Sequence, residues 1–239
     1  VWDASGSYVP ITTISTSIAS GKGYWVYFGN GQTNTSAITV DVTGTVRSGN
    51  FSIPLSYTNN GNQENDGWNL ISNPYPSPIK WSLLKGATSN IDNAIYVYNP
   101  DLNGGTGSYA SYVNGVSSPV VGSGGIGDSI PICQGFYVHS TGATSLSATE
   151  NIKTRGNPTF LRINSTPQTA SVLSLLRLKM TGPSNYKDET VLYEQTNASD
   201  SLDVEYDAIK MSGSGNLSPS ISLEKNGKLF QINGVAPLS

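Results

Sequence analysis

Aromatic side chains in two short segments are the residues of this sequence best suited to bind a ligand. Alternate residues of a β-strand face opposite sides, so a strand over residues 24–28 places Trp25 and Tyr27 on one face. A related strand over residues 135–139 places Tyr137 on the corresponding face. Flat aromatic rings with a polar edge can stack on sugar rings, so these residues predict a glycan-binding face if they are exposed. The alternative is that both faces of the two strands are covered and that the three side chains belong to the core.

An acidic run near the C-terminal end offers a second candidate site. Asp200, Asp203, Glu205 and Asp207 lie close together in the sequence, and carboxylate oxygens suit Ca²⁺, which takes about 6–8 oxygen ligands. The pattern of an EF-hand loop is absent, and a solvated acidic loop explains the same residues equally well. Calcium is the one cofactor that the sequence makes possible, and no other is predicted.

The only cysteine and the only histidine do not predict a catalytic pair. Cys133 and His139 are six residues apart on one expected strand, a distance of roughly 20 Å at about 3.3 Å per residue. A catalytic thiol needs a neighbouring base, so Cys133 is expected to be a small buried apolar side chain. A single cysteine also excludes an intrachain disulfide.

No other set of residues predicts catalysis. Glycoside hydrolysis needs two carboxyl groups about 5–9.5 Å apart in a cleft. The acidic pairs that raise this possibility, Glu64 with Asp66 and Glu189 with Glu194, have no supporting motif. The phosphate-binding, zinc-protease, nucleophile-elbow and dinucleotide-binding signatures are absent from the sequence. We therefore expect a protein that is not an enzyme.

The composition indicates an extracellular or cell-surface protein with an uncharged polar surface. Charged residues make up 12% of the 239 residues, and the formal net charge is −3, so hydroxyl and amide groups must form much of the surface. Without a basic stripe, nucleic acid is not an expected partner. Without an apolar run near 18 residues, membrane insertion is not expected either. The sequence begins at Val1 in what resembles the middle of a strand, which predicts a fragment of a longer protein.

The elements that must position these residues are expected to be almost entirely β-strands, with little or no helix. Residues 67–81 start as an apolar strand and then reach Pro74, Pro76 and Pro78, which lack the N–H groups of a sheet and end the strand in a rigid corner. One helical turn is expected over residues 81–86. Period-two alternation and turn residues predict strands over residues 8–14, 24–28, 37–44, 49–55, 94–98, 108–113, 131–139, 160–163, 171–180, 189–194, 207–211, 220–223 and 229–232.

Two parts of the chain repeat the same order of short motifs, which indicates an internal duplication. The segments Val1–Asp3, Gly6–Tyr8 and Gly23–Tyr27 recur as Val97–Asn99, Gly107–Tyr109 and Gly135–His139. The sequence becomes richer in charge around residues 148–158. We therefore predict an all-β chain: a duplicated antiparallel β domain over residues 1–150, incomplete at its N-terminus, and a β-sandwich domain over residues 156–239, which also ends as if cut short.

The Gly-Trp-Asn-Leu-Ile-Ser-Asn-Pro-Tyr-Pro-Ser motif of residues 67–77 and the Gln-Gly-Phe-Tyr-Val motif of residues 134–138 carry a family resemblance. They resemble a β-rich region of large secreted and surface proteins of Bacteroidota that are exported by the type IX secretion system. The resemblance implies export of the parent protein by that route, but no particular activity. It also implies O-glycosylation at Ser129 and Ser201, because each follows Asp and precedes an aliphatic residue.

Together, these features predict a non-catalytic structural or adhesion module of a larger secreted or cell-surface protein. Its expected partners are a glycan or a surface protein, together with other domains of the parent chain. The alternative is a carbohydrate-binding module that serves an attached enzyme. An exposed aromatic patch would favour this alternative, because a spacer needs none.

Overall fold

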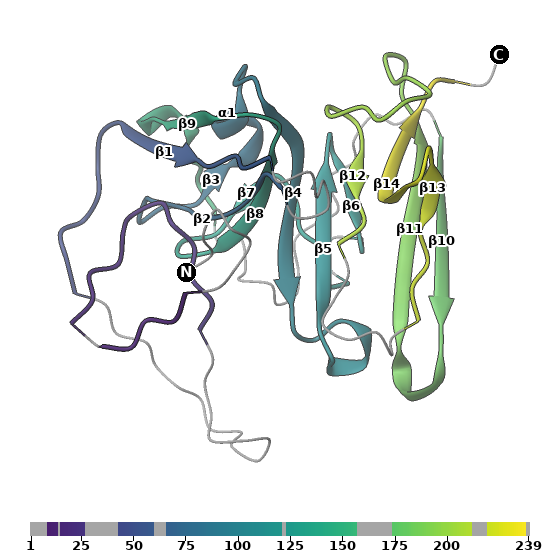
Figure 1. Cartoon of the computed structure of the whole chain (residues 1–239), viewed down its shortest axis with the longest axis horizontal. Coiled ribbons are helices and arrows are strands. Elements are labelled where there is room, and N and C mark those ends of the chain that lie inside the picture. The colour runs from purple at the N-terminus through teal and green to yellow at the C-terminus, as the bar shows by residue number, and fades with distance from the viewer. Residues whose placement is uncertain are drawn as a thin grey trace.

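The structure is a computed structural model that describes residues 9–13, 15–26, 43–59, 66–120, 123–156, 174–211 and 219–237. The all-β prediction is confirmed, because the described residues form fourteen strands and a single α-helix of five residues (Figure 1). Their other helical segments are the 3₁₀ turns η1 (Asn103–Gly105), η2 (Glu150–Ile152) and η3 (Pro183–Asn185). None of these helices has the length and hydropathy needed to span a membrane.

A five-stranded antiparallel sheet, which we call the central sheet, lies in the middle of the fold (Figure 1). Its strands in spatial order are β2 (Trp68–Ser72), β8 (Gly135–Ser140), β4 (Ile91–Asn99), β5 (Ser108–Val113) and β6 (Val116–Ser118). The middle strand β4 is buried along most of its length. A strand can be apolar on both of its faces only where both faces of its sheet are covered.

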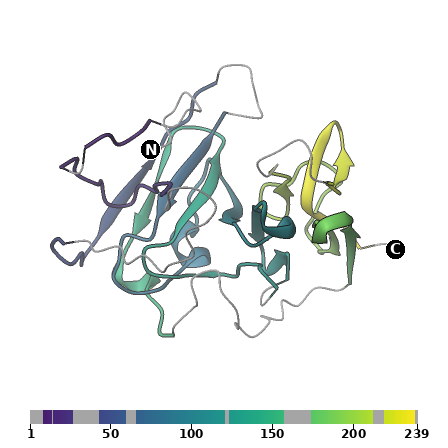
Figure 2. The same cartoon turned by 90° about the horizontal axis from the view of Figure 1, so that it is seen from below.

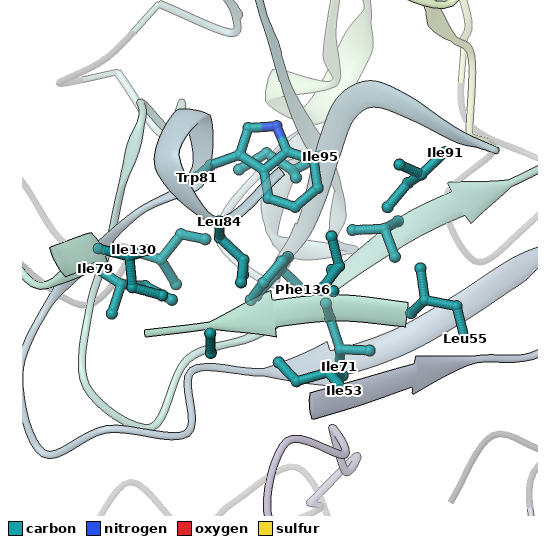
Figure 3. Packing of buried hydrophobic residues seen from close by; sticks show 14 of the residues in the cluster. Ile53, Leu55, Ile71, Ile79, Trp81, Leu84, Ile91, Ile95, Ile130 and Phe136 are labelled. Carbon is teal, nitrogen blue, oxygen red and sulfur yellow. The ribbon is translucent and has the colours of Figure 1, made fainter. Parts of the chain in front are cut away.

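One face of the central sheet is covered by two short strand pairs and the helix. Strand β1 (Phe51–Leu55) pairs with β9 (Thr144–Ala148), and β3 (Ile79–Lys80) pairs with β7 (Ser129–Ile130). The helix α1 (Trp81–Lys85) follows β3 directly. Between these elements and the sheet lies the first core, seen in Figure 3, whose fully buried large side chains include Ile53, Ile79, Trp81, Leu84, Ile95, Phe136 and Leu146.

Asn73 fixes the proline-rich corner that follows β2. Its Nδ2 donates hydrogen bonds to the carbonyl oxygens of Ser77 and Pro131 at 2.8 and 3.0 Å. Its Oδ1 accepts a bond of 3.0 Å from the N–H of Tyr75. These side-chain bonds satisfy backbone groups that the prolines leave without a ladder partner.

The helical turn predicted over residues 81–86 is confirmed, and a distant carboxylate supports its start. Asp128 lies just before β7, and its Oδ1 accepts a hydrogen bond of 2.7 Å from the N–H of Ser82. This bond satisfies one of the backbone donors that a helix start leaves without a partner. Gly86 ends the helix at a φ of 46°.

A second five-stranded sheet packs on the other face of the central sheet at its β5–β6 end (green to yellow in Figure 2). Its path runs through β10 (Leu175–Thr181), β11 (Lys187–Glu194), β14 (Lys228–Val235) and β12 (Ala208–Ile209), and β13 (Leu223–Lys225) also pairs with β14. Strands β11 and β14 are parallel, and the other pairs are antiparallel. Asn226 and Gly227, at φ of 53° and 75°, form the tight turn between β13 and β14 that the sequence predicts.

The two sheets share a second core, which gives the fold its sandwich-like character. The central sheet contributes Ala94, Tyr96, Val113, Val116 and Tyr137, and the second sheet contributes Val191, Tyr193, Ala208 and Ile232. One layer of the sandwich therefore comes from residues 68–140 and the other from residues 175–235. The predicted domain division near residues 148–158 stays a prediction, with these two layers packed on each other.

The strand predicted over residues 24–28 is wrong in its described part. Residues 24–26 lie outside strands, and a side chain of this segment makes a tertiary contact instead: Trp25 Nε1 donates a hydrogen bond of 2.7 Å to the hydroxyl of Tyr137. Residues 9–13 are also outside strands. Most of the first copy of the proposed duplication lies outside the described residues, as do residues 37–42 and 160–163, so the duplication stays a prediction.

Candidate functional site

Four aromatic side chains pack together on the face of the central sheet that carries the second core. We call Trp25, Tyr98, Tyr109 and Tyr137 the aromatic cluster. Ring centroids lie 4.7 Å apart for Trp25 and Tyr98, 5.4 Å for Tyr98 and Tyr109, and 5.8 Å for Tyr109 and Tyr137. A hydrogen bond of 2.7 Å from Trp25 Nε1 to the hydroxyl of Tyr137 closes the group. Because tilted and edge-to-face pairs are favourable, the four rings hold one another in place.

The members of the aromatic cluster differ in their exposure to solvent. Trp25 is 44% exposed, whereas Tyr137 is 3% exposed. The sequence pattern suggests that Tyr137 presents its ring to a ligand, but the structure buries this residue. Tyr137 lies in the second core and orients Trp25 through its hydroxyl. Tyr27, the third predicted stacking residue, lies outside the described residues.

The backbone of residues 19–26, which we call the strap, carries Trp25 to the cluster. The strap runs along the edge of β2, and the N–H of Gly23 donates a hydrogen bond of 3.0 Å to the carbonyl of Leu70. A β-carbon at Gly23 would lie 2.6 Å from the Cγ of Leu70. Only glycine therefore allows this approach without displacing the leucine.

His139 forms an enclosed polar group beside the second core. Its Nδ1 lies 2.8 Å from Asp92 Oδ2, and its Nε2 lies 3.1 Å from the main-chain oxygen of Asp66. The main-chain oxygen can only accept, so a hydrogen bond there uses a proton on Nε2. The indole of Trp68 packs on the imidazole, with ring centroids 5.0 Å apart. Both ring nitrogens have protein partners, and the contact with Asp92 ties β8 to β4.

Asp207, one of the four predicted calcium ligands, is buried and satisfied by protein donors. Its Oδ1 accepts hydrogen bonds from the N–H of Gly234 at 2.9 Å and from Asn233 Nδ2 at 3.0 Å. Its Oδ2 accepts a bond of 2.8 Å from the N–H of Asp203. Burial raises the pKa of Asp207, since desolvation of the carboxylate outweighs these bonds.

The other three predicted calcium ligands face different surroundings. Asp203 Oδ1 accepts a hydrogen bond of 3.1 Å from the N–H of Glu205, and Glu205 Oε1 pairs with Lys85 Nζ at 2.6 Å. Asp200 is exposed. In the part of the chain that the structure describes, no three His, Cys, Asp or Glu side chains form a group that could hold a metal ion. The structure therefore does not assemble the predicted calcium site.

The two predicted glycosylation sites differ in accessibility. Ser201 is exposed in a bend, and its N–H donates a hydrogen bond of 3.3 Å to Ser199 Oγ. Ser129 is half-buried in β7, where it pairs with Lys80 of β3. Modification at Ser129 and Ser201 stays a prediction, and Ser201 is the more accessible of the two.

The expectation that Cys133 is buried is wrong. The residue is exposed, with a φ of 59°, in a turn closed by a hydrogen bond of 3.4 Å from the N–H of Gln134 to the carbonyl of Pro131. The apolar sequence around it resembles a continuous strand, but β8 begins only at Gly135. A positive φ removes Cys133 from the strand and turns its side chain toward solvent.

A buried polar group joins the two sheets and includes an acid considered above for catalysis. Glu189 is 5% exposed, and its Oε1 accepts hydrogen bonds from Arg177 Nη1 and, at 3.2 Å, from Ser118 Oγ. Gln231 Nε2 donates to the same Ser118 oxygen at 3.0 Å. These contacts bind β6 of the central sheet to β10, β11 and β14, so Glu189 has a structural role.

Sequence reasoning missed Tyr98, Tyr109 and Trp68. Tyr98 and Tyr109 are direct cross-strand partners in the β4–β5 pair, and Trp68 lies opposite His139 in the β2–β8 pair. The available signal was the tyrosine content of residues 96–98 and 109–112, but the pairing register was needed to show that the rings meet.

Comparisons with known proteins give one match. A family model described as "Domain of unknown function (DUF8693)" matches residues 2–236. No curated protein and no solved structure matches the chain.

Proposed function

Since this chain belongs to the DUF8693 family, whose description gives no function, we propose from its structure that it is a non-catalytic adhesion module of a larger secreted or cell-surface protein. The observation that carries the proposal is the half-exposed indole of Trp25, held in one orientation by the buried hydroxyl of Tyr137. Exposure of an aromatic ring to water is normally unfavourable in free energy. An exposed ring that is also fixed in one orientation suits contact with a ligand.

The proposed ligand is a glycan. The C–H faces of a pyranose ring fit against an aromatic side chain, and Trp25, at 44% exposure, presents part of its indole to solvent. Pre-ordering of Trp25 reduces the entropy lost on binding. The motifs of residues 67–77 and 134–138, which resemble exported proteins, support the extracellular setting.

The non-catalytic part of the proposal is supported by what the candidate catalytic groups do. His139 and Asp92 are hydrogen-bonded to each other. Asp207 accepts three hydrogen bonds from protein donors. Glu189 joins the two sheets. Each of these groups is engaged in contacts that stabilise the fold, and a catalytic role would require those contacts to break.

The test is a glycan array and an insoluble-polysaccharide pull-down with the wild-type protein, Trp25→Ala and Trp25→Phe. We expect Trp25→Ala to lose at least about tenfold in affinity and Trp25→Phe to retain part of it, because an aromatic contact contributes about 1–3 kcal/mol. Leu229→Ala, at another exposed apolar side chain, is the matched control, and circular dichroism checks folding. Unchanged binding by folded Trp25→Ala would refute the role of Trp25. Loss of glycan binding in EDTA would show that binding requires a metal ion.

A second candidate, a carbohydrate-binding module that serves an attached enzyme, uses the same contact. It is favoured by the same exposure of Trp25, and it differs in what the parent protein does. Deleting the module, or introducing Trp25→Ala, would then lower activity of the parent on insoluble polysaccharide but leave activity on soluble oligosaccharides intact. Equal effects on both substrates would contradict the accessory role.

A further inference from the structure

Strand β10 forms one edge of the second sheet. Among the strands that the structure describes, it pairs only with β11, and it is the outermost strand on the right of Figure 1. The open side of an edge strand presents a row of backbone N–H and C=O groups to which another strand can add. The residues of β10 show which kind of strand fits there.

The hydrogen bonds at the two ends of the β10–β11 pair show which backbone groups face the open side. The N–H of Glu194 donates to the carbonyl of Ser174 at 2.9 Å. At the other end, the N–H of Gly182 donates to the carbonyl of Tyr186 at 2.8 Å. The register between these bonds has no shift, and directly bonded residues alternate along an antiparallel pair. The even-numbered residues of β10 therefore bond to β11. The residues whose N–H and C=O groups point to the open side are Leu175, Arg177, Lys179 and Thr181.

Leucine side chains of β10 leave apolar surface along this edge. Leu176 and Leu178 are 53% and 39% exposed. Alternation places both on the face of the strand opposite to Arg177, whose side chain points toward the central sheet and donates to the carbonyl of Ser117. Exposed apolar side chains beside unpaired backbone groups are typical of a surface that another strand covers.

The face of β10 that carries Arg177 has a positive charge that is only partly neutralised. Arg177 and Lys179 both pair with Glu189, and Lys179 Nζ lies 3.5 Å from Glu189 Oε2. One carboxylate can neutralise only one of these two cations. The side chain of Lys179 is 62% exposed, against 18% for that of Arg177. Lys179 is therefore the cation that is able to pair with an acidic side chain of an added strand.

Two copies of β10 are poorly suited to pair with each other. In the antiparallel register centred on Leu178, Arg177 of one copy would lie opposite Lys179 of the other. The next register in either direction would place Arg177 opposite Arg177, or Lys179 opposite Lys179. Like charges that lie directly opposite destabilise a strand pair. The charges of β10 therefore favour an acidic partner strand over a second copy of this chain.

From these observations we propose that β10 binds an extended, acidic segment of a partner protein as an added antiparallel strand. The segment has an acidic residue opposite Lys179 and apolar residues on its other face, beside Leu176 and Leu178. Its backbone bonds to the outward N–H and C=O groups of Arg177 and Lys179. Main-chain bonds supply affinity for any extended chain, and the alternating side chains select the sequence. The inference concerns a second ligand and does not depend on the glycan binding proposed above.

Calorimetry with three synthetic peptides tests the proposal. The acidic peptide is acetyl-Thr-Val-Glu-Val-Glu-Val-Thr-amide, the basic peptide has lysine in place of both glutamates, and the third is the acidic peptide with both glutamates N-methylated. We expect the acidic peptide to bind about tenfold more tightly than the basic one, with a smaller preference at high salt. N-methylation should abolish binding, because it removes the donors to β10 and keeps the charge. Equal affinity for the acidic and basic peptides, or unchanged binding after N-methylation, would overturn the proposal.

Hydrogen exchange locates the peptide on the structure. Without peptide, the amides of Arg177 and Lys179 should exchange faster than those of Leu176 and Leu178, which bond to β11. Saturating acidic peptide should slow exchange at Arg177 and Lys179 by at least about tenfold and leave the two leucines unchanged. Protection elsewhere but not in β10 would contradict the site. Slow exchange at Arg177 and Lys179 without peptide, in a protein that sediments as a dimer, would identify a second copy as the occupant and overturn the acidic partner.

Variants separate the charge from the apolar contact and from the glycan site. Lys179→Gln should abolish the preference for the acidic peptide, whereas Leu178→Thr should weaken binding of both peptides. Lys22→Gln, at an exposed lysine of the strap, is the matched control, and thermal melts check folding. A preference that persists in folded Lys179→Gln would overturn the contact assigned to Lys179. Trp25→Ala should leave peptide binding unchanged, so the failure of glycan binding and the failure of the β10 site are distinguishable.

Discussion

The indole Nε1 of Trp25 donates a hydrogen bond of 2.7 Å to the hydroxyl of Tyr137, although the two residues are 112 positions apart in the chain. One partner is half-exposed and the other is buried. The bond therefore anchors a surface side chain to a residue of the second core and restricts its orientation.

Tyr137→Phe removes the acceptor for Trp25 and keeps the buried ring. We expect glycan affinity to fall about fivefold, because a neutral hydrogen bond contributes about 1 kcal/mol and the released indole must be ordered by the ligand. The melting temperature should fall by no more than about 4 °C. Calorimetric titration measures the affinity, with Tyr186→Phe as a control near η3. An affinity equal to that of the wild type would show that the bond does not organise the site.

His139→Phe leaves the buried Asp92 carboxylate without its donor. A buried polar group left without its hydrogen-bond partner costs about 1–3 kcal/mol, and more if it is charged, so urea denaturation should show a loss of at least this size in the free energy of unfolding. Asp92→Asn keeps an acceptor for Nδ1–H and should cost less, about 1–2 kcal/mol. If Asp92→Asn proves the more damaging change, the Asp92 carboxylate does not depend on His139 in the way that the 2.8 Å contact indicates.

Arg177→Met removes the guanidinium from Glu189 between the two sheets. The remaining carboxylate keeps Ser118 and, at 3.5 Å, Lys179, so we expect a loss of about 3 kcal/mol in the free energy of unfolding. In a double-mutant cycle, adding Glu189→Gln should recover part of this loss. Strictly additive effects would contradict direct coupling between Arg177 and Glu189.

Asp207 predicts a pH dependence of stability. Burial raises its pKa above the unfolded value, so the folded state holds this proton more tightly than the unfolded chain does. Its contribution to stability is therefore present below the unfolded pKa and is lost as the pH rises through the folded pKa. The stability advantage of the wild type over Asp207→Asn should be larger near about pH 4 than near about pH 7, as measured by urea denaturation. An advantage that grows toward pH 7 would contradict the raised pKa.

Much of the strand pattern follows from the sequence alone. Residues 94–98 and 108–113 alternate as strands do, and they lie in β4 and β5. Strand β9 was missed because hydroxyl and small residues dominate it, even though Leu146 and Ala148 are buried at alternate positions. Residues 24–26 have strong β propensity, but their side chains form tertiary contacts that no local pattern reports.

The site was less predictable than the strands, because it depends on contacts between distant segments. Trp25 was found from its type and its place in an aromatic segment, whereas burial of Tyr137 required the second sheet. The acidic run has residue types that suit a metal site, but the sequence gives no sign that Asp207 accepts hydrogen bonds from backbone N–H groups. The sequence shows which side chains have groups that can bind a ligand. The packing of the fold determines which of these groups already have protein partners.

Strand β14 pairs with β11, β12 and β13 and follows all three in the chain. During synthesis, the central sheet and its first core can form while β14 is still inside the ribosome, but the second sheet cannot close. Until β14 emerges, the side chains of β4, β5 and β6 that face the second core lack their cover. This interval is when the nascent chain is most exposed to aggregation, and truncation before β14 would make that state permanent.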